Sequence, residues 1–259
     1  MEVHLEPGHP SPCPIEPIGV IHTCFKEKFG IPRQPNLAAK APGMLEFFPE
    51  FSRQEAVRGL EQFSHIWLIF LFHRAVKKEG GWSPMVRPPR LGGNKKIGVF
   101  ASRSPFRPNP IGMSCVRLER VEITAKGPVL HLTGVDILDQ TPVLDIKPYL
   151  PYSDRVDTAR DGFAPAPGPG ACEVSFSSTA ATQILERQKT FPNLMSIITQ
   201  VLENDPRPGY SSTHCSNMEK DFGPEKTEEN RLYGIRLFDF DLKWQAAGNK
   251  IQVIRLDTA

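Results

Sequence analysis

The sequence lacks acidic residues over a long central stretch, with no aspartate or glutamate from Gly80 to Leu118. Because no carboxylate lies nearby in the chain, the neutralising partners must be distant carboxylates or an anionic ligand, and we favour the ligand. The net charge of the whole chain is only +2, so a nucleic-acid partner is indicated by this local cluster alone. The basic residues of the stretch are Arg87, Arg90, Lys95, Lys96, Arg103, Arg107 and Arg117.

Long hydrophobic runs and a signal peptide are also missing. The longest apolar run, Ile66 to Phe72, is too short to cross a bilayer and is typical of a buried strand. Residues 1–7 have neither the basic start nor the apolar stretch of a signal peptide. We therefore expect a cytoplasmic protein without membrane association.

Cysteines are few and widely spaced, and no pair has the spacing of a zinc site. An odd number of cysteines without a paired pattern indicates reduced thiols, which fits a cytoplasmic protein and predicts no metal centre. The five are Cys13, Cys24, Cys115, Cys172 and Cys215.

Common catalytic signatures are absent as well. The chain has no Walker A loop, no glycine-rich dinucleotide fingerprint, no Gly-x-Ser-x-Gly elbow and no His-Glu-x-x-His helix. These absences argue against P-loop nucleotide hydrolases, dinucleotide-binding dehydrogenases, serine hydrolases of the α/β class and zinc proteases. The glycine-rich segment from Arg90 to Lys95 favours a tight turn slightly over a phosphate contact.

The most informative segment that is present runs from Phe100 to Gly112. Three prolines and a glycine restrict its backbone, which excludes a helix interior or a central strand. Arginines, serines and an asparagine project from it. Rigid polar loops on a scaffold are where sites usually lie, so this loop is a candidate binding element. The alternative is a stiff loop whose arginines only pair with nearby carboxylates.

Three further loops combine proline with polar side chains: Pro32–Pro35, Asp139–Pro142 and Asn204–Tyr210. Each taken alone is consistent with an exposed turn. Four such loops in one chain are difficult to explain by stability alone, so we expect them to form a site or sites.

Hydrophobic patterning predicts a mainly β N-terminal domain over residues 15–152, preceded by a tail over residues 1–14. Only Gln54–Phe63 has a helical pattern there. The strand signals are the alternation of Ile18 with Val20, the run from His65 to Phe72, the alternation of Val116 with Leu118 continuing through Val121 and Ile123, and the segment from Val129 to Leu138.

Residues 153–172 are rich in proline and glycine and predict a linker. Residues 173–259 then predict a small α+β domain. A strand is expected at Val174 and Phe176, and a helix from Thr182 to Lys189. A second helix buries Leu194, Ile197, Ile198, Val201 and Leu202 on one face, and strands follow from Phe238 to Trp244 and from Ile251.

Several motifs, in order, resemble the TsaA-like family from about residue 15 to the C-terminus. The matching segments are Arg33–Pro35, Phe63–Trp67, Pro88–Gly93, Arg103–Gly112, Thr141–Tyr149 and Asp205–Pro208. The resemblance implies an eight-strand-like β-barrel that binds S-adenosylmethionine, a homodimer and a small C-terminal domain. It also implies N-methylation of threonylcarbamoyl-adenosine beside the anticodon of a threonine tRNA.

The resemblance also assigns residues. It implies cofactor contacts at Pro32, Arg33, Gln34, His73, Arg103, Met113, Asp139, Gln140, Thr141 and Pro142. We expect Arg107, Asn109 and Arg207 on the tRNA side, and Asp205 and Tyr210 as the catalytic candidates, Tyr210 as a stacking side chain or proton acceptor.

One departure from the family is Gln140, where the family often has glycine, so a position with positive φ would hold a residue that adopts it reluctantly. A second is Ser102, where threonine is frequent. Two other functions stay open: a small-molecule methyltransferase on the same barrel, and a non-catalytic RNA-binding module.

Overall fold

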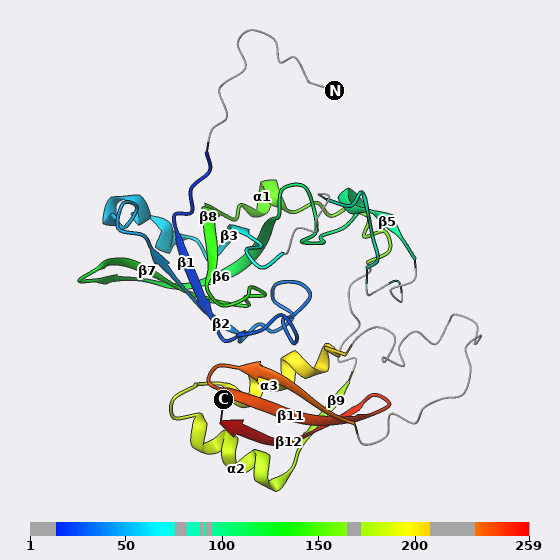
Figure 1. Ribbon diagram of the computed structural model, residues 1–259. Coiled ribbons are helices and arrows are strands. Elements are labelled where there is room, and N and C mark those ends of the chain that lie inside the picture. Colours follow the sequence, from blue (N-terminus) through cyan, green and yellow to red (C-terminus); the bar gives the residue numbers. More distant parts are fainter. Residues whose placement is uncertain are drawn as a thin grey trace.

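The computed structural model describes residues 14–75, 82–88, 91, 95–164, 172–207 and 231–258 (Figure 1). Its N-terminal part is a closed antiparallel barrel of six strands in the order β1-β2-β7-β6-β3-β8. The strands are β1 (Gly19–Thr23), β2 (Pro42–Phe47), β3 (His65–Leu71), β6 (Ile111–Thr124), β7 (Gly127–Thr133) and β8 (Thr141–Pro148). The β-barrel is confirmed, with six strands in the described part and not eight.

Along the barrel strands, buried side chains that point into the barrel alternate with side chains that point outward. Strand β3 turns Ile66, Leu68 and Phe70 inward, and β6 turns Val116 and Leu118 inward. Period-two burial is what the pleat of a half-buried strand requires. The predicted strands at 65–72 and 116–118 are therefore confirmed, although β6 begins earlier, at the end of the proline-rich loop.

The strand that the alternation of Ile18 with Val20 indicated is present as β1. It buries Gly19, Ile21 and Thr23. A Cβ on Gly19 would lie 2.2 Å from the carbonyl oxygen of Glu46, so the two backbones approach too closely for a side chain there. With glycine at an inward position, the hydrophobic pattern did not reveal the buried face.

Two other predicted elements are shorter than expected. The helix over Gln54–Phe63 is a pair of 3-10 helices, η1 (Gln54–Val57) and η2 (Leu60–Gln62), separated at Gly59, whose φ is 87°. The strand expected to reach Leu138 ends at Thr133, because Gly134 (φ 75°) turns the chain.

Short elements border the barrel. Strands β4 (Met85–Val86) and β5 (Ile97–Gly98) pair with each other, and η4 (Val99–Ala101) leads into the proline-rich loop. Helix α1 (Pro151–Asp154) follows β8. The linker was predicted to begin at residue 153, so its first two residues belong to this helix.

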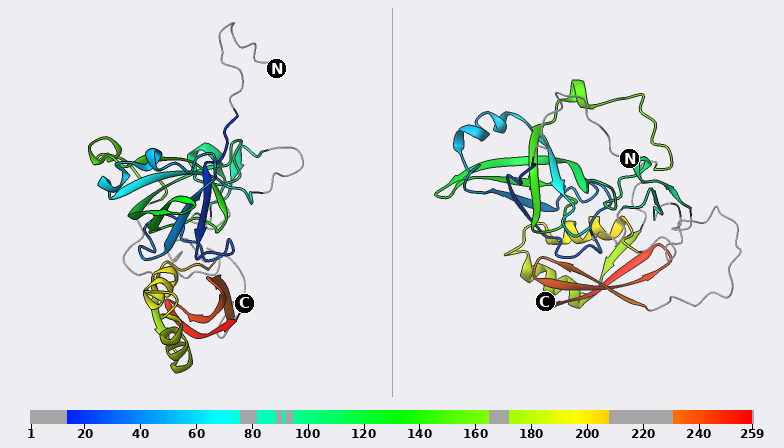
Figure 2. Two further views of the ribbon diagram at one scale, coloured as in Figure 1. Left: turned by 90° about the vertical axis from the view of Figure 1, so that its left-hand side faces the viewer. Right: turned by 45° about the horizontal axis from the view of Figure 1, so that its top comes forward.

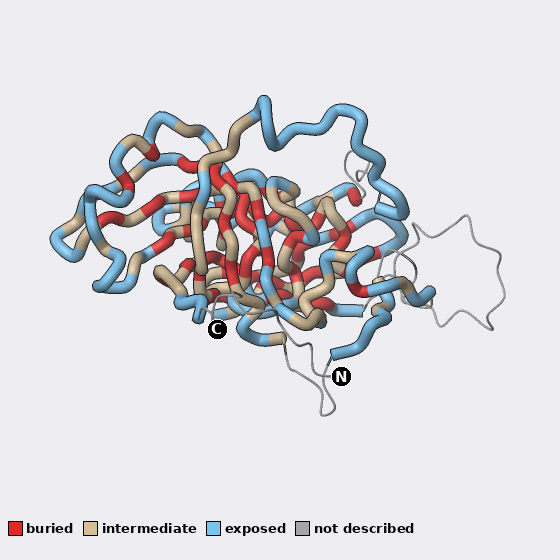
Figure 3. The backbone as a smooth tube through the Cα atoms, turned by 90° about the horizontal axis from the view of Figure 1, so that it is seen from above, coloured by how far each residue is buried: buried red, intermediate tan, exposed pale blue. Residues whose placement is uncertain are grey.

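The C-terminal part is the α+β unit that the sequence predicted. Strands β9 (Glu173–Phe176), β10 (Leu232–Leu237), β11 (Phe240–Ala247) and β12 (Lys250–Thr258) form one sheet in the order β10-β11-β12-β9. Helices α2 (Ser178–Arg187) and α3 (Leu194–Glu203) pack on it, and the predicted apolar face of α3 is fully buried. Figure 3 marks along the backbone which described residues are buried and which are exposed.

Phe238, predicted in a strand, lies in the β10–β11 turn with φ 52°. Its N–H donates to the Cys24 carbonyl at 2.8 Å, so it belongs to the seam between the two units. The Arg236 N–H donates to Glu27 Oε1 at 2.8 Å, and the Asn204 amide donates to the Leu37 carbonyl at 3.1 Å. The C-terminal unit therefore packs under the loop that joins β1 to β2 (Figure 2).

A buried ion pair lies in this seam. Arg207 Nε donates to Asp205 Oδ1 at 2.7 Å and Nη2 to Oδ2 at 2.9 Å, with only 5% and 10% of the two side chains exposed. Arg207 Nη2 also donates to the Gly248 carbonyl at 2.9 Å, and the Arg207 carbonyl accepts from Arg33 Nη2 at 3.4 Å. The pair fixes the chain after α3 against the β11–β12 turn.

Replacing Arg207 with alanine should lower the free energy of unfolding by about 3–5 kcal/mol, because Asp205 would be left buried without its partner. Chemical denaturation measures the loss. Arg255→Ala is the matched control: its partner is Asp257, both side chains are about two-fifths exposed, and the cost should stay below about 1 kcal/mol. Equal losses in the two variants would contradict a structural role for the buried pair.

Candidate functional site

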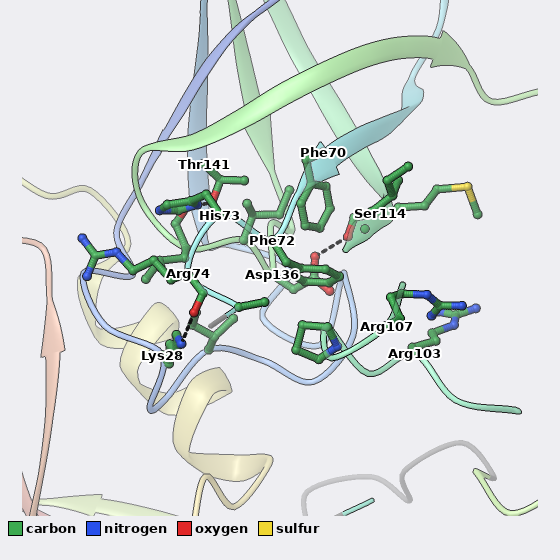
Figure 4. Close-up of a pocket in the computed structure, with 18 of the residues that line it drawn as sticks. Lys28, Phe70, Phe72, His73, Arg74, Arg103, Arg107, Ser114, Asp136 and Thr141 are labelled. Carbon is green, nitrogen blue, oxygen red and sulfur yellow. Dashed lines mark hydrogen bonds between the residues drawn. The ribbon is translucent and has the colours of Figure 1, made fainter. Parts of the chain in front are cut away.

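A cavity of about 640 Å³ lies at one end of the barrel (Figure 4). Four segments line it: the loop around 31–34, the end of β3 with residues 72–75, the segment 103–114 and the loop 136–141. Three of the four proline-containing polar loops of the sequence therefore meet at one place.

Aromatic side chains form the apolar part of the cavity. Phe70 and Phe72 meet edge to face, with ring centroids 5.2 Å apart. A Cβ on Gly112 would lie 2.3 Å from the Phe70 ring, so this glycine makes room for it. Phe70 follows the inward register of β3, and its ring lines the end of the barrel core.

Asp136 is the sole carboxylate among the described residues that line the cavity. Ser114 Oγ, on the inner face of β6, donates to Asp136 Oδ1 at 2.6 Å. Burial raises the pKa of Asp136 from 3.8 to about 6, against the opposing effects of the Ser114 hydrogen bond, its own backbone N–H and the Arg103 charge. Figure 4 shows the pair beside Phe70 and Phe72.

Cationic side chains also line the cavity, namely Lys28, Arg33, Arg74, Arg103 and Arg107. Arg103 donates to Gln34 Oε1, and Lys28 Nζ donates to the Arg74 carbonyl at 2.6 Å. Desolvation, then the charges of Arg74 and Lys28, lower the pKa of His73. The cavity therefore suits a ligand that carries negative groups.

The loop after β7 is held by hydrogen bonds to the end of β1. Thr23 Oγ1 donates to the Ile137 carbonyl at 2.8 Å, and the Thr23 N–H donates to Asp139 Oδ1 at 2.8 Å. Asp139 Oδ2 also pairs with Lys26 at 2.8 Å. Gln140 has a φ of 64°, so the position where the family often has glycine does lie in the left-handed region.

The structure brings most of the predicted site residues together. Those that line the cavity are Pro32, Arg33, Gln34, His73, Arg103, Arg107, Asn109, Met113 and Thr141. Asp139, Gln140 and Pro142 do not line it; Asp139 supports the loop behind it. Asp205 and Arg207 lie in the seam between the two units, and Tyr210 lies outside the described residues.

Sequence reasoning missed Asp136, Ser114, Lys28 and the phenylalanine pair. Asp136 lies three residues before the predicted loop Asp139–Pro142, and nothing in the local pattern separates the two carboxylates. The described residues hold no cluster of His, Cys, Asp and Glu suited to a metal ion, and none of the described helices is long and apolar enough to cross a membrane.

Comparison with protein families gives matches over both units. Residues 20–155 match the tRNA-methyltransferase O N-terminal domain, and residues 169–259 match the TrmO C-terminal domain. The chain belongs to the TrmO family. The two matched ranges correspond to the barrel and to the α+β unit.

Similar proteins agree with this assignment. The tRNA (adenine(37)-N6)-methyltransferase of Escherichia coli is 42% identical over 93% of this chain and 97% of its own length. A putative S-adenosylmethionine-dependent methyltransferase of Pseudomonas aeruginosa is 49% identical over 89% and 91%. A crystal structure of TrmO, 42% identical, superposes with a TM-score of 0.74 over 95% of this chain and all of that one.

Gly112→Ala should cost about 1–3 kcal/mol of stability, because the new methyl group would overlap the Phe70 ring. Gly98→Ala is the control, since a Cβ there meets nothing within 4 Å. Denaturant titration of both variants measures the difference. Two equally stable variants would mean that Phe70 is free to move away from the strand.

Asp136→Asn should change how stability depends on pH. The folded state raises the pKa of this carboxyl to about 6, so wild-type stability falls as pH rises from about 4 to 6, by about 2–3 kcal/mol. The asparagine cannot ionise, so the stability of the variant relative to the wild type should increase as pH rises over this range. Thermal unfolding across pH measures it. Asp157→Asn, at an exposed ion pair, should show no such gain, and a pH-independent difference for Asp136→Asn would contradict the prediction.

Proposed function

We propose that this chain transfers a methyl group from S-adenosylmethionine to N6 of an adenosine beside the anticodon of a tRNA. The observation that carries the proposal is the gathering of seven cofactor positions implied by family resemblance around one cavity: Pro32, Arg33, Gln34, His73, Arg103, Met113 and Thr141. The names of the relatives in Escherichia coli and Pseudomonas aeruginosa support the same reaction and cofactor.

The residues present fit S-adenosylmethionine. The cavity volume is within the range of small-molecule sites, about 300–1,000 Å³. Phe70 and Phe72 offer apolar ring surface for an adenine, and arginines offer paired N–H donors for a carboxylate. When bound, the cofactor supplies a methyl group activated by a positively charged sulfur. We assign the carboxylate contact to Arg103.

The substrate that we propose is threonylcarbamoyl-adenosine in a threonine tRNA. Its threonyl carboxylate and the neighbouring phosphates are anionic, and they complement a site where the described lining residues include five cationic side chains and a single carboxylate. One cofactor carboxylate occupies only part of this cationic set. We therefore propose Arg107 and Asn109 as contacts to the substrate.

The C-terminal unit is proposed to serve the tRNA, with Tyr210 as a stacking side chain. Arg207 and Asp205 are bonded to each other in a buried ion pair. We therefore propose that they hold the 205–207 turn in shape for the tRNA and do not contact the tRNA themselves. The same turn reaches the cavity through the bond between the Arg207 carbonyl and Arg33.

The chain's contribution to rate is chiefly position. Holding the acceptor nitrogen in line with the methyl group accounts for about 7–11 kcal/mol in favourable cases. The hydrogen bonds that fix the 136–141 loop and the prolines around Arg103 and Arg107 provide the rigidity that such positioning requires.

The direct test uses threonine tRNA prepared with and without the threonylcarbamoyl group. Purified protein and S-adenosylmethionine should methylate only the modified tRNA, as read by mass spectrometry of the digested nucleosides. Cofactor binding without methylation of any RNA would favour a small-molecule methyltransferase. RNA binding without cofactor binding would favour a non-catalytic module. Either result would overturn the proposal.

A homodimer in the cytoplasm completes the proposal, and it rests on resemblance to the family and on the nature of the substrate. Light scattering at micromolar concentration tests the dimer. A stable monomer that is fully active would contradict it.

Arg103→Ala should weaken S-adenosylmethionine binding by about 1.5–3 kcal/mol, because a charge-assisted hydrogen bond to its carboxylate would be lost. Titration calorimetry measures this change. Arg160→Ala, at an exposed position outside the cavity, should leave the affinity as it is. Unchanged affinity in Arg103→Ala would remove this residue from the cofactor site.

A further inference from the structure

We propose that Asp136 is the proton acceptor in methyl transfer, taking the N6 proton of the substrate adenosine. The inference rests on the proposed function and adds to it the group that removes the proton. The residues that family resemblance assigned to the site do not include Asp136, and its place in the cavity is what identifies it.

The need for an acceptor follows from the bonds that change. The substrate nitrogen forms a bond to the methyl carbon while the carbon–sulfur bond breaks and leaves its electron pair on sulfur. The N6–H bond breaks, its electron pair stays on nitrogen, and the proton moves to a carboxylate oxygen of Asp136. A nitrogen attached to a carbonyl is a weak nucleophile until it loses this proton, so a base within hydrogen-bond reach accelerates the step.

Asp136 is placed for this role by its contacts. Its carboxylate faces the cavity. Among the described residues, Ser114 is the only one whose side chain donates a hydrogen bond to it, from Oγ to Oδ1. One oxygen is thereby oriented, and the carboxylate keeps capacity to accept a further proton donor. Thr23 holds the backbone of the next residue through the Ile137 carbonyl, and the Ser114 bond holds the carboxylate itself.

The other candidate carboxylates are already engaged. Asp139 accepts from the Thr23 N–H and pairs with Lys26, and it does not line the cavity. Asp205 holds Arg207 through both oxygens in the seam between the units. A carboxylate that must stay ionised to hold an arginine is a poor proton acceptor, since the proton would break the pair.

The surroundings of Asp136 raise the pKa of its carboxyl group, which makes the carboxylate a better proton acceptor. Desolvation among Phe70, Phe72 and neighbouring apolar groups outweighs the Ser114 bond and the Arg103 charge, so the carboxyl titrates near pH 6. It is therefore mostly ionised at pH 7 and can still release the proton afterwards. The other charged or titratable groups that line the cavity are Lys28, Arg33, His73, Arg74 and Arg107.

The first experiment compares Asp136→Asn with the wild type, and Asp157→Asn serves as the matched control on an exposed carboxylate. Single-turnover methyl transfer to threonylcarbamoyl tRNA should fall at least about 100-fold in Asp136→Asn. Calorimetry with S-adenosylhomocysteine should give the wild-type affinity in all three proteins. If affinity and transfer fall together, Asp136 is a cofactor contact and the proposal is wrong.

The second experiment uses Ser114→Ala. Loss of its hydrogen bond to the charged form should move the acidic limb of the rate profile about one pH unit upward. The carboxyl carbon resonance that disappears in Asp136→Asn should shift its titration midpoint by the same amount in Ser114→Ala, without any cofactor or tRNA present. A rate profile that stays in place while the resonance moves would overturn the proposal.

The two proposals fail in different ways. If the wild type methylates no RNA, the proposed function fails and the proton-acceptor role fails with it. If the wild type is active and Asp136→Asn is equally active, the function holds and only the role of Asp136 is refuted.

Discussion

The hydrogen bonds between Thr23 and the loop after β7 are the interaction on which the site depends. One threonine uses its N–H on Asp139 and its hydroxyl on the Ile137 carbonyl, and the Gln140 N–H returns to the Ile21 carbonyl at 2.9 Å. These bonds hold residues 137–140 against the end of β1, next to the cavity. They hold the backbone between Asp136 and Thr141, two residues that line the cavity.

The loop between β1 and β2 has two functions in the structure. Its residues 31–34 line the cavity, and its flanks contact the C-terminal unit through Phe25, Glu27 and Leu37. The unit that we propose for tRNA therefore supports the wall that we propose for the cofactor. Rigid packing of this kind transmits a displacement from one face of the loop to the other.

The sequence predicted those features that depend on local patterns. A continuous run of large apolar side chains revealed β3, alternating ones revealed the middle of β6, and the i, i+3, i+4 spacing revealed α3. The inward face of β1 escaped detection because Gly19 and Thr23 occupy it, and β2, β8 and β10 were not expected. Strand pairing in a barrel supplies the stability that those short segments lack by themselves.

The site was predictable to the extent that resemblance named its residues, and the rest required three dimensions. Phe70 has the pattern of a core residue, and only its place at the end of β3 makes it a cavity wall. Arg207 has the pattern of a ligand-binding arginine because its loop resembles the cavity loops. Its partner lies two residues earlier, and the pair became evident only when the burial of both was known.

The seam between the units also has a consequence for biosynthesis. Glu27 and Arg236 are 209 positions apart in the chain, yet they share a hydrogen bond, and Phe25 bridges to Leu237. Domains fold in order as the ribosome releases them, so the barrel is made long before its loop can be braced. The last strands to be translated therefore complete the contacts of this early loop, and a chain interrupted before β10 would lack the bonds that Arg236 and Leu237 supply to Glu27 and Phe25.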